Sequence, residues 1–237
     1  MPKVSFVCPT QNRIEWLPLA IQSLMTQTEP DIEIVIVNDG STDGTKEFLD
    51  SWATQDKRVK VIHNEEPQGA GPSRNIGAAA ATSDVIGVCD DDDVYIDTRA
   101  AEIVKWFEKH PESELVTFPY VAINYFEEVL ESFPGKPFDL DGYMTDGGVN
   151  YYCNPAAAYR RKSAEQMGGY PKETETMTDD YQFLKNWIGA GKKVDFCGND
   201  GGGYIPFATM HRILPKSMMA KLRGFDSSWL KKKEITV

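Results

Sequence analysis

The stretch VIGVCDDDD, residues 85–93, is an apolar run that ends in four consecutive aspartates. A short, uninterrupted run rich in Val and Ile, bounded by polar residues, is typical of a strand that is buried on both faces. Four adjacent carboxylates repel one another, so a folded chain rarely places them at a strand end without a compensating charge. The stretch therefore predicts a buried strand with a ligand-binding cluster at its carboxyl end.

Two earlier strands repeat this arrangement. Apolar runs at residues 4–8 and 32–37 are followed by the clusters Pro9-Thr10-Gln11-Asn12-Arg13 and Asn38-Asp39-Gly40-Ser41. Further strands are expected at 59–62 and 114–118, and helices at 14–27, 43–52, 73–81 and 98–109. Strands that alternate with helices indicate β-α-β units and a mostly parallel, Rossmann-like sheet, in which ligands bind at the carboxyl ends of the strands. The pattern predicts an α/β fold with one site rather than three.

The pattern loosens after residue 118. Residues 119–150 show no clear period, and helices are expected at 159–167 and 179–187. We therefore divide the chain into residues 1–118, residues 119–209 as a second half of the same domain, and a basic tail at 210–237. The tail holds seven Lys or Arg and two acids, a net charge of +5, which leaves −16 for the rest of a chain whose total is −11.

Composition limits the classes of protein. The 237 residues are 41% hydrophobic, which is ample for a core. The sequence has neither an apolar run long enough to span a bilayer nor a signal peptide, so we expect a cytoplasmic protein. Four cysteines without a CxxC pair predict reduced, buried thiols. An acidic body makes a nucleic-acid partner unlikely, whereas the tail is either solvated or in weak contact with an anionic membrane surface.

The four aspartates at 90–93 become compatible when they share a divalent cation. Mg²⁺ and Mn²⁺ prefer carboxylate oxygen, and Mg²⁺ typically takes one or two carboxylates plus substrate phosphates. The competing interpretation is a solvated acidic loop. Residues 39–50 imitate an EF-hand loop but follow a strand, and residues 69–74 (GAGPSR) imitate a dinucleotide fingerprint but lack its last glycine. The three converging strand ends favour a metal–diphosphate site.

Several segments occur in the order of a known family. VSFVCPTQNR, IEIVIVNDGSTDGT, GAGPSRNIGAAAATSDVIGVCDDDD and the downstream AAAYRRKSAEQMGGYPKETETMTDDYQFLKNW resemble the family-two glycosyltransferases, which have the GT-A fold. The resemblance covers roughly residues 3–190. It implies a metal-dependent inverting enzyme that moves a sugar from a nucleotide diphosphate sugar, with a UDP-sugar favoured, to a hydroxyl of a glycan, lipid-linked or other acceptor. It also implies that residues 1–118 bind the nucleotide sugar and residues 119–209 bind the acceptor.

The resemblance also implies roles for individual residues. Asp90 and Asp92 match the DxD pair, with Asp92 the direct ligand of Mn²⁺ or Mg²⁺, Asp91 the spacer and Asp93 a supporting acid. His211 is similar to a metal-binding histidine of some members. Asp179 and Asp180 stand where the family has Glu-Asp, and one of them resembles the catalytic base. The residues expected at the donor are Pro9, Thr10, Gln11, Asn12, Arg13, Asp39, Arg74, Asp90 and Asp91.

Three departures from the family pattern qualify these roles. Gln11 replaces a frequent aromatic residue, Asp97 replaces a common proline, and Asp179 shortens the usual Glu. The chemistry favours Asp180 as the base, since a carboxylate opposite the leaving diphosphate can take the proton from the attacking hydroxyl. For Asp179, helix capping alone is the competing role. A catalytically silent nucleotide-sugar or glycan-binding module on the same fold is the alternative function.

Overall fold

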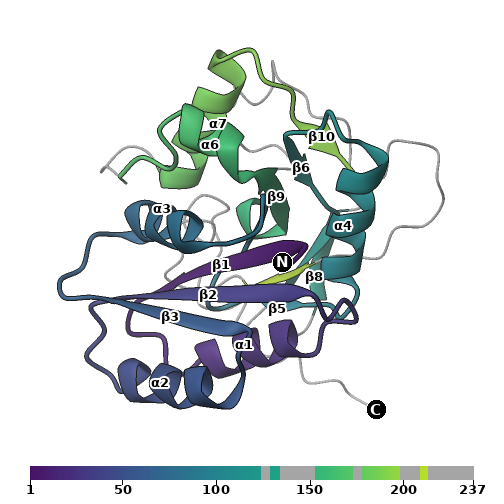
Figure 1. Ribbon diagram of the computed structural model, residues 1–237. Coiled ribbons are helices and arrows are strands. Elements are labelled where there is room, and N and C mark those ends of the chain that lie inside the picture. Colours follow the sequence, from purple (N-terminus) through teal and green to yellow (C-terminus); the bar gives the residue numbers. More distant parts are fainter. Residues whose placement is uncertain (124–128, 134–152, 173–177, 198–208, 213–237) are drawn as a thin grey trace.

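The apolar runs pair into one seven-stranded sheet (Figure 1). The computed structural model describes residues 1–123, 129–133, 153–172, 178–197 and 209–212. The strands of this sheet are β1 (Val4–Thr10), β2 (Ile32–Asp39), β3 (Val59–Asn64), β4 (Val85–Val88), β6 (Leu115–Thr117), β9 (Ala157–Arg160) and β10 (Asp195–Phe196). Their order is β10-β6-β9-β4-β1-β2-β3, and β9 alone runs antiparallel to its neighbours. The predicted α/β fold with a mostly parallel sheet is confirmed.

Helices cover both faces of the sheet. One face packs against α1 (Leu17–Met25), α2 (Thr45–Gln55) and α4 (Arg99–Lys109), and the other against α3 (Ala70–Ala80), α6 (Arg161–Gln166) and α7 (Asp179–Gly189). Two apolar clusters result, one on each side of the strands. Because β1 and β2 are buried on both faces, their sequences are apolar without alternation.

A second, four-stranded sheet begins directly after the four aspartates at 90–93, called the acidic run below. Its strands are β5 (Val94–Tyr95), β7 (Tyr120–Ile123), β8 (Val129–Phe133) and β11 (Thr209–Arg212), in the order β5-β11-β7-β8. β5 follows Asp93 directly and pairs with β11, in the register Thr209 to Tyr95. Residues far apart in the sequence therefore meet beside the four aspartates.

The helix predicted over residues 159–167 is wrong in its first part. Residues 157–160 form β9, and only Arg161–Gln166 is helical, as α6. Residues 157–160 form a strand because they pair with β4 on one side and β6 on the other. Tyr159 lies opposite Ile86 of β4 and Leu115 of β6. Because β9 lies inside the first sheet, the parts of the chain before and after residue 118 interleave, and our division there stays a prediction.

Other predictions concern the cysteines, the membrane and the tail. All four cysteines are free and buried, as predicted. Within the described ranges, no helix has the length and apolar character needed to cross a membrane. Residues 213–237 of the basic tail lie outside the described residues, so its expected membrane contact stays a prediction. Three-residue helix η1 (Asn154–Ala156) leads into β9.

Candidate functional site

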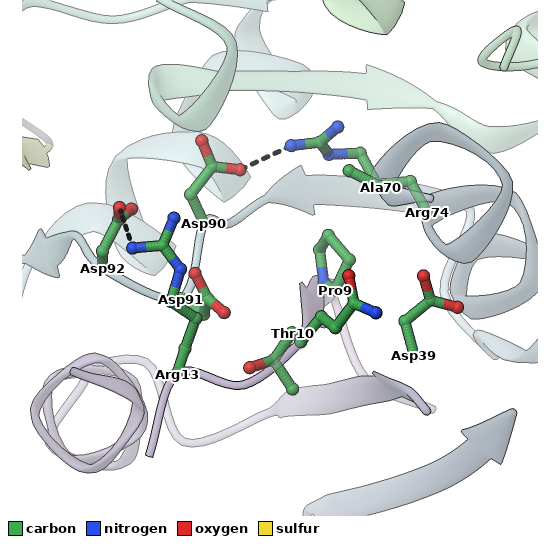
Figure 2. A pocket seen from close by; sticks show the side chains of 10 residues that line it. Pro9, Thr10, Arg13, Asp39, Ala70, Arg74, Asp90, Asp91 and Asp92 are labelled. Carbon is green, nitrogen blue, oxygen red and sulfur yellow. Dashed lines mark hydrogen bonds and ion pairs between the residues drawn. The ribbon is translucent and has the colours of Figure 1, made fainter. Parts of the chain in front are cut away.

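A cleft of about 290 Å³ lies at the carboxyl ends of β1, β2 and β4 (Figure 2). The polar clusters that follow these three parallel strands meet there, as the strand pattern predicts. The start of α3 closes another side of the cleft. The lining residues are Pro9, Thr10, Gln11, Arg13, Asp39, Ala70, Arg74, Asp90, Asp91 and Asp92.

Hydrogen bonds join the loop after β1 to the loop after β2. The Asn12 side-chain oxygen accepts from the backbone N–H of Thr42 at 2.7 Å, and the Asn12 N–H donates to Ser41 Oγ at 2.9 Å. The N–H of Ile14 donates to Asp43 Oδ2 at 3.1 Å. Asn12 has a φ of 53°, a left-handed conformation that asparagine tolerates better than most residues. Asn12 thus shapes the cleft from behind and is not among its lining residues.

Asp39 is held by the protein itself. Its Oδ1 accepts from Asn64 Nδ2 at 2.7 Å, and its Oδ2 accepts from the Gly69 N–H at 2.8 Å. The Gln68 N–H lies between both oxygens. Burial alone would raise the pKa of Asp39, but these hydrogen bonds outweigh it and lower the pKa. Asp39 therefore enters the cleft as a fixed carboxylate that anchors the start of α3.

Gly40 permits the turn that places Asp39. Its φ is +71°, and a Cβ there would lie 2.9 Å from Cδ of Pro67. Only glycine combines this backbone conformation with so close an approach of another chain segment. Gly40 therefore has a structural reason to follow Asp39 at the end of β2.

The acidic run presents three of its four carboxylates to the cleft. Asp90 and Asp92 point to different sides, each toward an arginine (Figure 2). Burial, with the added repulsion of Asp90, raises the pKa of Asp91 to about 6. Burial and the carboxylates of the other three aspartates raise the pKa of Asp92 well above its usual value. Asp93 is buried and is not among the lining residues. The cleft therefore carries concentrated, strongly interacting negative charge.

Arg74 of α3 links the acidic run to α7. Its Nη2 lies 2.7 Å from Asp90 Oδ1, and its Nη1 is hydrogen-bonded to Asp179 Oδ2. The guanidinium also lies over the ring of Tyr170, with Cζ 5.3 Å from the centroid. Burial opposes the charge of Arg74, but Asp179 and Asp90 more than compensate and raise its pKa. Arg74 is thus a buried bridge between two acids 89 residues apart in the sequence.

Asp179 and Asp180 begin α7 outside the cleft lining. Asp179 is 7% exposed, and burial raises its pKa although Arg74 opposes the shift. Asp180 is half-buried, and its Oδ1 accepts from the Tyr181 N–H at 2.7 Å. The two neighbours therefore differ: Asp179 is committed to an ion pair, whereas Asp180 makes a local bond at the helix start.

The remaining predicted ligand is His211. It lies on β11, where its backbone pairs with Ala122 of β7, but its side chain lies outside what the structure describes. Among the described residues, no group of three or more His, Cys, Asp or Glu side chains is arranged to hold a metal ion. Our sequence analysis missed Ala70, which lines the cleft, and the buried pair Tyr95 and Arg99 behind the aspartates. The GAGPSR segment, which contains Ala70 and ends at Arg74, is the sequence signal for Ala70.

Comparison with known proteins identifies relatives of the chain. Residues 5–168 match the family model described as Glycosyl transferase family 2. The putative glycosyltransferase EpsH of Bacillus subtilis is 41% identical over 140 residues, which cover 59% of this chain and 38% of EpsH. An uncharacterized glycosyltransferase of Haemophilus influenzae is 32% identical over 191 residues, covering 76% of this chain and 60% of the relative. The chain thus spans at most three fifths of these relatives.

Solved structures share the fold at lower identity. The S. aureus protein TarS, crystallised with UDP-GlcNAc, superposes with a TM-score of 0.73 at 19% identity, covering 92% of this chain and 60% of TarS. The mannosyltransferase PcManGT of Pyrobaculum calidifontis, in complex with GDP-Man and Mn²⁺, gives 0.62 at 19% identity, covering 86% of this chain and 59% of that protein. Both likenesses establish the predicted GT-A fold.

Proposed function

Because the chain belongs to glycosyltransferase family 2, we propose that it transfers a sugar from a nucleotide diphosphate sugar to an acceptor hydroxyl with inversion at the anomeric carbon. The observation that carries the proposal is the cleft itself, where the ends of β1, β2 and β4 bring Asp39 and the acidic run together beside Arg74 of α3. We further propose a UDP-sugar as donor, which the likeness to TarS, crystallised with UDP-GlcNAc, supports. The nucleoside would lie near Asp39 and the diphosphate near Asp90 and Asp92.

A divalent cation, Mn²⁺ or Mg²⁺, suits the acidic run. Two carboxylates, Asp90 and Asp92, offer hard oxygen ligands, and substrate phosphates commonly complete such a set. The upward pKa shift of Asp92 comes in part from repulsion that a bound cation would relieve. When bound, the cation neutralises the negative charge that develops on the leaving diphosphate. We keep His211 as a third ligand in this proposal, since β11 lies beside β5.

Asp180 acts as the general base. It takes the proton of the acceptor hydroxyl while the hydroxyl oxygen attacks the anomeric carbon from the side opposite the diphosphate, whose bond to the sugar breaks. Asp180 lies in the first turn of α7, where a carboxylate interacts favourably with the positive end of the helix dipole. Asp179 is less suited to this task because Arg74 already engages its carboxylate. Its proposed role is to hold the start of α7 against α3, which is more than helix capping.

The acceptor is a hydroxyl of a glycan, a lipid-linked sugar or another molecule, bound by residues 119–209. We propose a cytoplasmic location, with weak membrane contact through the basic tail. A nucleic-acid acceptor is disfavoured by the net charge of −11. The alternative function, a catalytically silent nucleotide-sugar or glycan-binding module, shares the same cleft and differs only in the absence of turnover.

The test compares wild type with Asp180→Asn. With Mn²⁺ present, wild type should release the nucleoside diphosphate from a UDP-sugar, slowly to water and faster with an acceptor. Asp180→Asn should bind the donor normally but lose about 10²–10⁴-fold in turnover, the range typical for removal of a general base. Wild-type turnover in the variant would refute the base assignment. Donor binding by the wild type without turnover on any acceptor would favour the silent module.

A further inference from the structure

A fully buried arginine lies directly behind the acidic run. Arg99, the first residue of α4, is 0% exposed. Its Nη2 donates to the carbonyl oxygens of Val88 at 2.7 Å and Ala157 at 3.3 Å, and its Nη1 lies 3.4 Å from Cys89 Sγ. A buried guanidinium is costly unless its N–H groups and charge are compensated. Arg99 thereby joins α4, the end of β4 and the start of β9 at one point.

Tyr95 connects this arginine to the first aspartate. The Arg99 guanidinium lies over the Tyr95 ring, with Cζ 4.6 Å from the centroid. The Tyr95 hydroxyl accepts from the Asp90 N–H at 2.6 Å and donates to the Asp90 carbonyl oxygen at 2.9 Å. Both main-chain groups of Asp90 are therefore fixed by one side chain, which is 2% exposed. Arg99 and Tyr95 together hold the backbone from Val88 to Asp90.

The position of the charge matters as well as the hydrogen bonds. Arg99 is a permanent cation on the interior side of a run of four carboxylates. Its Nη1 lies 3.4 Å from Sγ of Cys89, the residue before Asp90, so the positive charge is next to the start of the run. We expect a positive charge held there to offset part of the repulsion among the carboxylates before any ligand binds. The backbone of the run can then stay in one conformation with or without a bound cation.

We propose that Arg99 and Tyr95 are positioning residues, which hold the backbone of residues 88–90 in place, so that only side chains have to move when Asp90 and Asp92 bind a divalent cation. The inference rests on the metal dependence proposed above. It adds two residues that touch neither donor nor metal and act only through the main chain of the acidic run. Their contribution should appear as cation affinity and as local rigidity.

The test measures Mn²⁺ affinity in the presence of UDP, from the electron paramagnetic resonance signal of free Mn²⁺. Tyr95→Phe keeps the buried ring and removes only the hydroxyl. Its dissociation constant for Mn²⁺ should rise about tenfold, the low end of the effect of removing a group that orients metal ligands. Hydrogen exchange at the Asp90 N–H, measured without metal, should accelerate in the same variant. Arg99→Lys should weaken Mn²⁺ binding less than Arg99→Met, because it keeps the charge.

Ser113→Ala is the matched control. Ser113 lies beyond the carboxyl end of α4, and its Oγ accepts a buried hydrogen bond from Trp106 Nε1 at 3.0 Å, so the variant should lower Tm without changing Mn²⁺ affinity. If Tyr95→Phe binds Mn²⁺ as tightly as wild type, the positioning role is wrong and the proposed function stands. If wild type itself binds no Mn²⁺ with UDP, the proposed metal dependence fails and takes this inference with it.

Discussion

Neighbouring aspartates of the acidic run have different surroundings. Asp91 is 9% exposed, whereas the side chain of Asp92 is 17% exposed and lies 3.6 Å from Arg13 Nη1. Arg13 is itself 40% exposed, so solvent weakens this ion pair and a stronger cation can replace it. Asp92 is therefore better placed than Asp91 to bind a metal ion, which would replace Arg13 as its partner.

The first prediction contrasts Asp92→Asn with Asp91→Asn. Asp92→Asn should lose at least about 100-fold of the Mn²⁺-stimulated transfer rate, because several kcal/mol of charge stabilisation depend on the ligand. Asp91→Asn, in the spacer position, should stay within about tenfold of wild type. Initial rates measured over a range of Mn²⁺ concentrations give both values. An equal loss in the two variants would contradict the assignment of Asp92 as the direct ligand.

A second prediction concerns Asp39 and pH. Its folded-state pKa is lowered by hydrogen bonds, so the ionised carboxylate stabilises the fold above the unfolded-state pKa of about 3.9, and this stability is lost as pH falls through the folded-state value. Asp39→Asn should lower the free energy of unfolding by about 2–3 kcal/mol at pH 7. The difference from wild type should shrink below about pH 4. Urea unfolding between pH 7 and pH 3 measures it.

The exposed Asp97 provides the control for this experiment. Asp97→Asn should follow wild type at every pH, because its side chain makes no hydrogen bond that the structure describes. A difference between Asp39→Asn and wild type that is constant down to pH 3 would mean that the ionised carboxylate is not what stabilises the start of α3.

At the residue scale, strand-end aspartates are predictable and their partners are not. Asp90 and Asp92 are visible in the sequence because they follow an apolar run directly. The ion pair between Arg74 and Asp179 spans 105 residues, and no local pattern specifies it. The same holds for Arg99, which reads in the sequence as an ordinary first-turn residue of a helix. Both arginines have a structural role because they are buried beside their partners, and this burial depends on the tertiary fold rather than on the local sequence.

Among the elements, α3 contacts both the segment around Tyr170 and the start of α7. Asn75 exchanges two hydrogen bonds with the backbone of Tyr170, at 2.7 and 2.8 Å, and Arg74 pairs with Asp179. Gly71 lets α3 approach closely, since a Cβ there would collide with the Pro171 carbonyl oxygen and lie 3.0 Å from Cβ of Asp179. The short sequence from Gly71 to Asn75 thus sets the position of the amino end of α7.

A third prediction follows for Gly71→Ala. The added methyl group must push α3 away from the backbone at Pro171 and from Asp179 at the start of α7, because the Pro171 carbonyl oxygen cannot turn aside as a side chain could. The free energy of unfolding should fall by about 1–3 kcal/mol, as for overpacked cores, and transfer should fall with it as the bridge from Arg74 to Asp179 lengthens. Guanidinium unfolding and a transfer assay at a temperature where the variant is folded measure the two effects.

Gly189→Ala is the matched control for Gly71→Ala. Gly189 lies in the last turn of α7, and a Cβ there would meet no described atom within 4 Å. Since alanine favours a helix more than glycine does, this variant should be as stable as wild type or more stable by up to about 1 kcal/mol. If both variants unfold like wild type, the close contact of α3 with α7 is not what positions Asp179.

The sequence patterns predict the buried parallel strands of the first half of the chain better than β9, which inserts between β4 and β6. β1, β2 and β4 were found because apolar runs between polar clusters are unambiguous when both faces are buried. The last two residues of β9 fall in the helix predicted over 159–167, because YRRKSAEQM is rich in helix-forming residues. The register of Tyr159 opposite Leu115 and Ile86 overrides that local preference. β9 is a strand because it pairs with β4 and β6, and a single sequence does not show which strands will pair.

For the molecule as a whole, the two sheets meet at the four aspartates beside the cleft. The first sheet delivers the carboxyl ends of β1, β2 and β4, and the second begins with β5, immediately after Asp93. β9 returns between β4 and β6 and carries the chain on to α6 and α7, so the candidate base and the acidic run belong to one packed unit. Donor binding at the cleft should therefore stabilise the whole fold rather than one lobe.

The last prediction uses that coupling to identify the donor. A ligand at 100 times its dissociation constant stabilises the native state by about 2.7 kcal/mol, which corresponds to a rise in Tm of roughly 5–10 °C for a chain of this size. A thermal-shift screen of UDP- and GDP-sugars, each with Mn²⁺ or with EDTA, should give the largest shift for one UDP-sugar with Mn²⁺. Asp92→Asn should abolish the part of the shift that Mn²⁺ adds. A larger response to GDP-sugars would overturn the UDP assignment, and equal shifts with Mn²⁺ and EDTA would overturn the metal site.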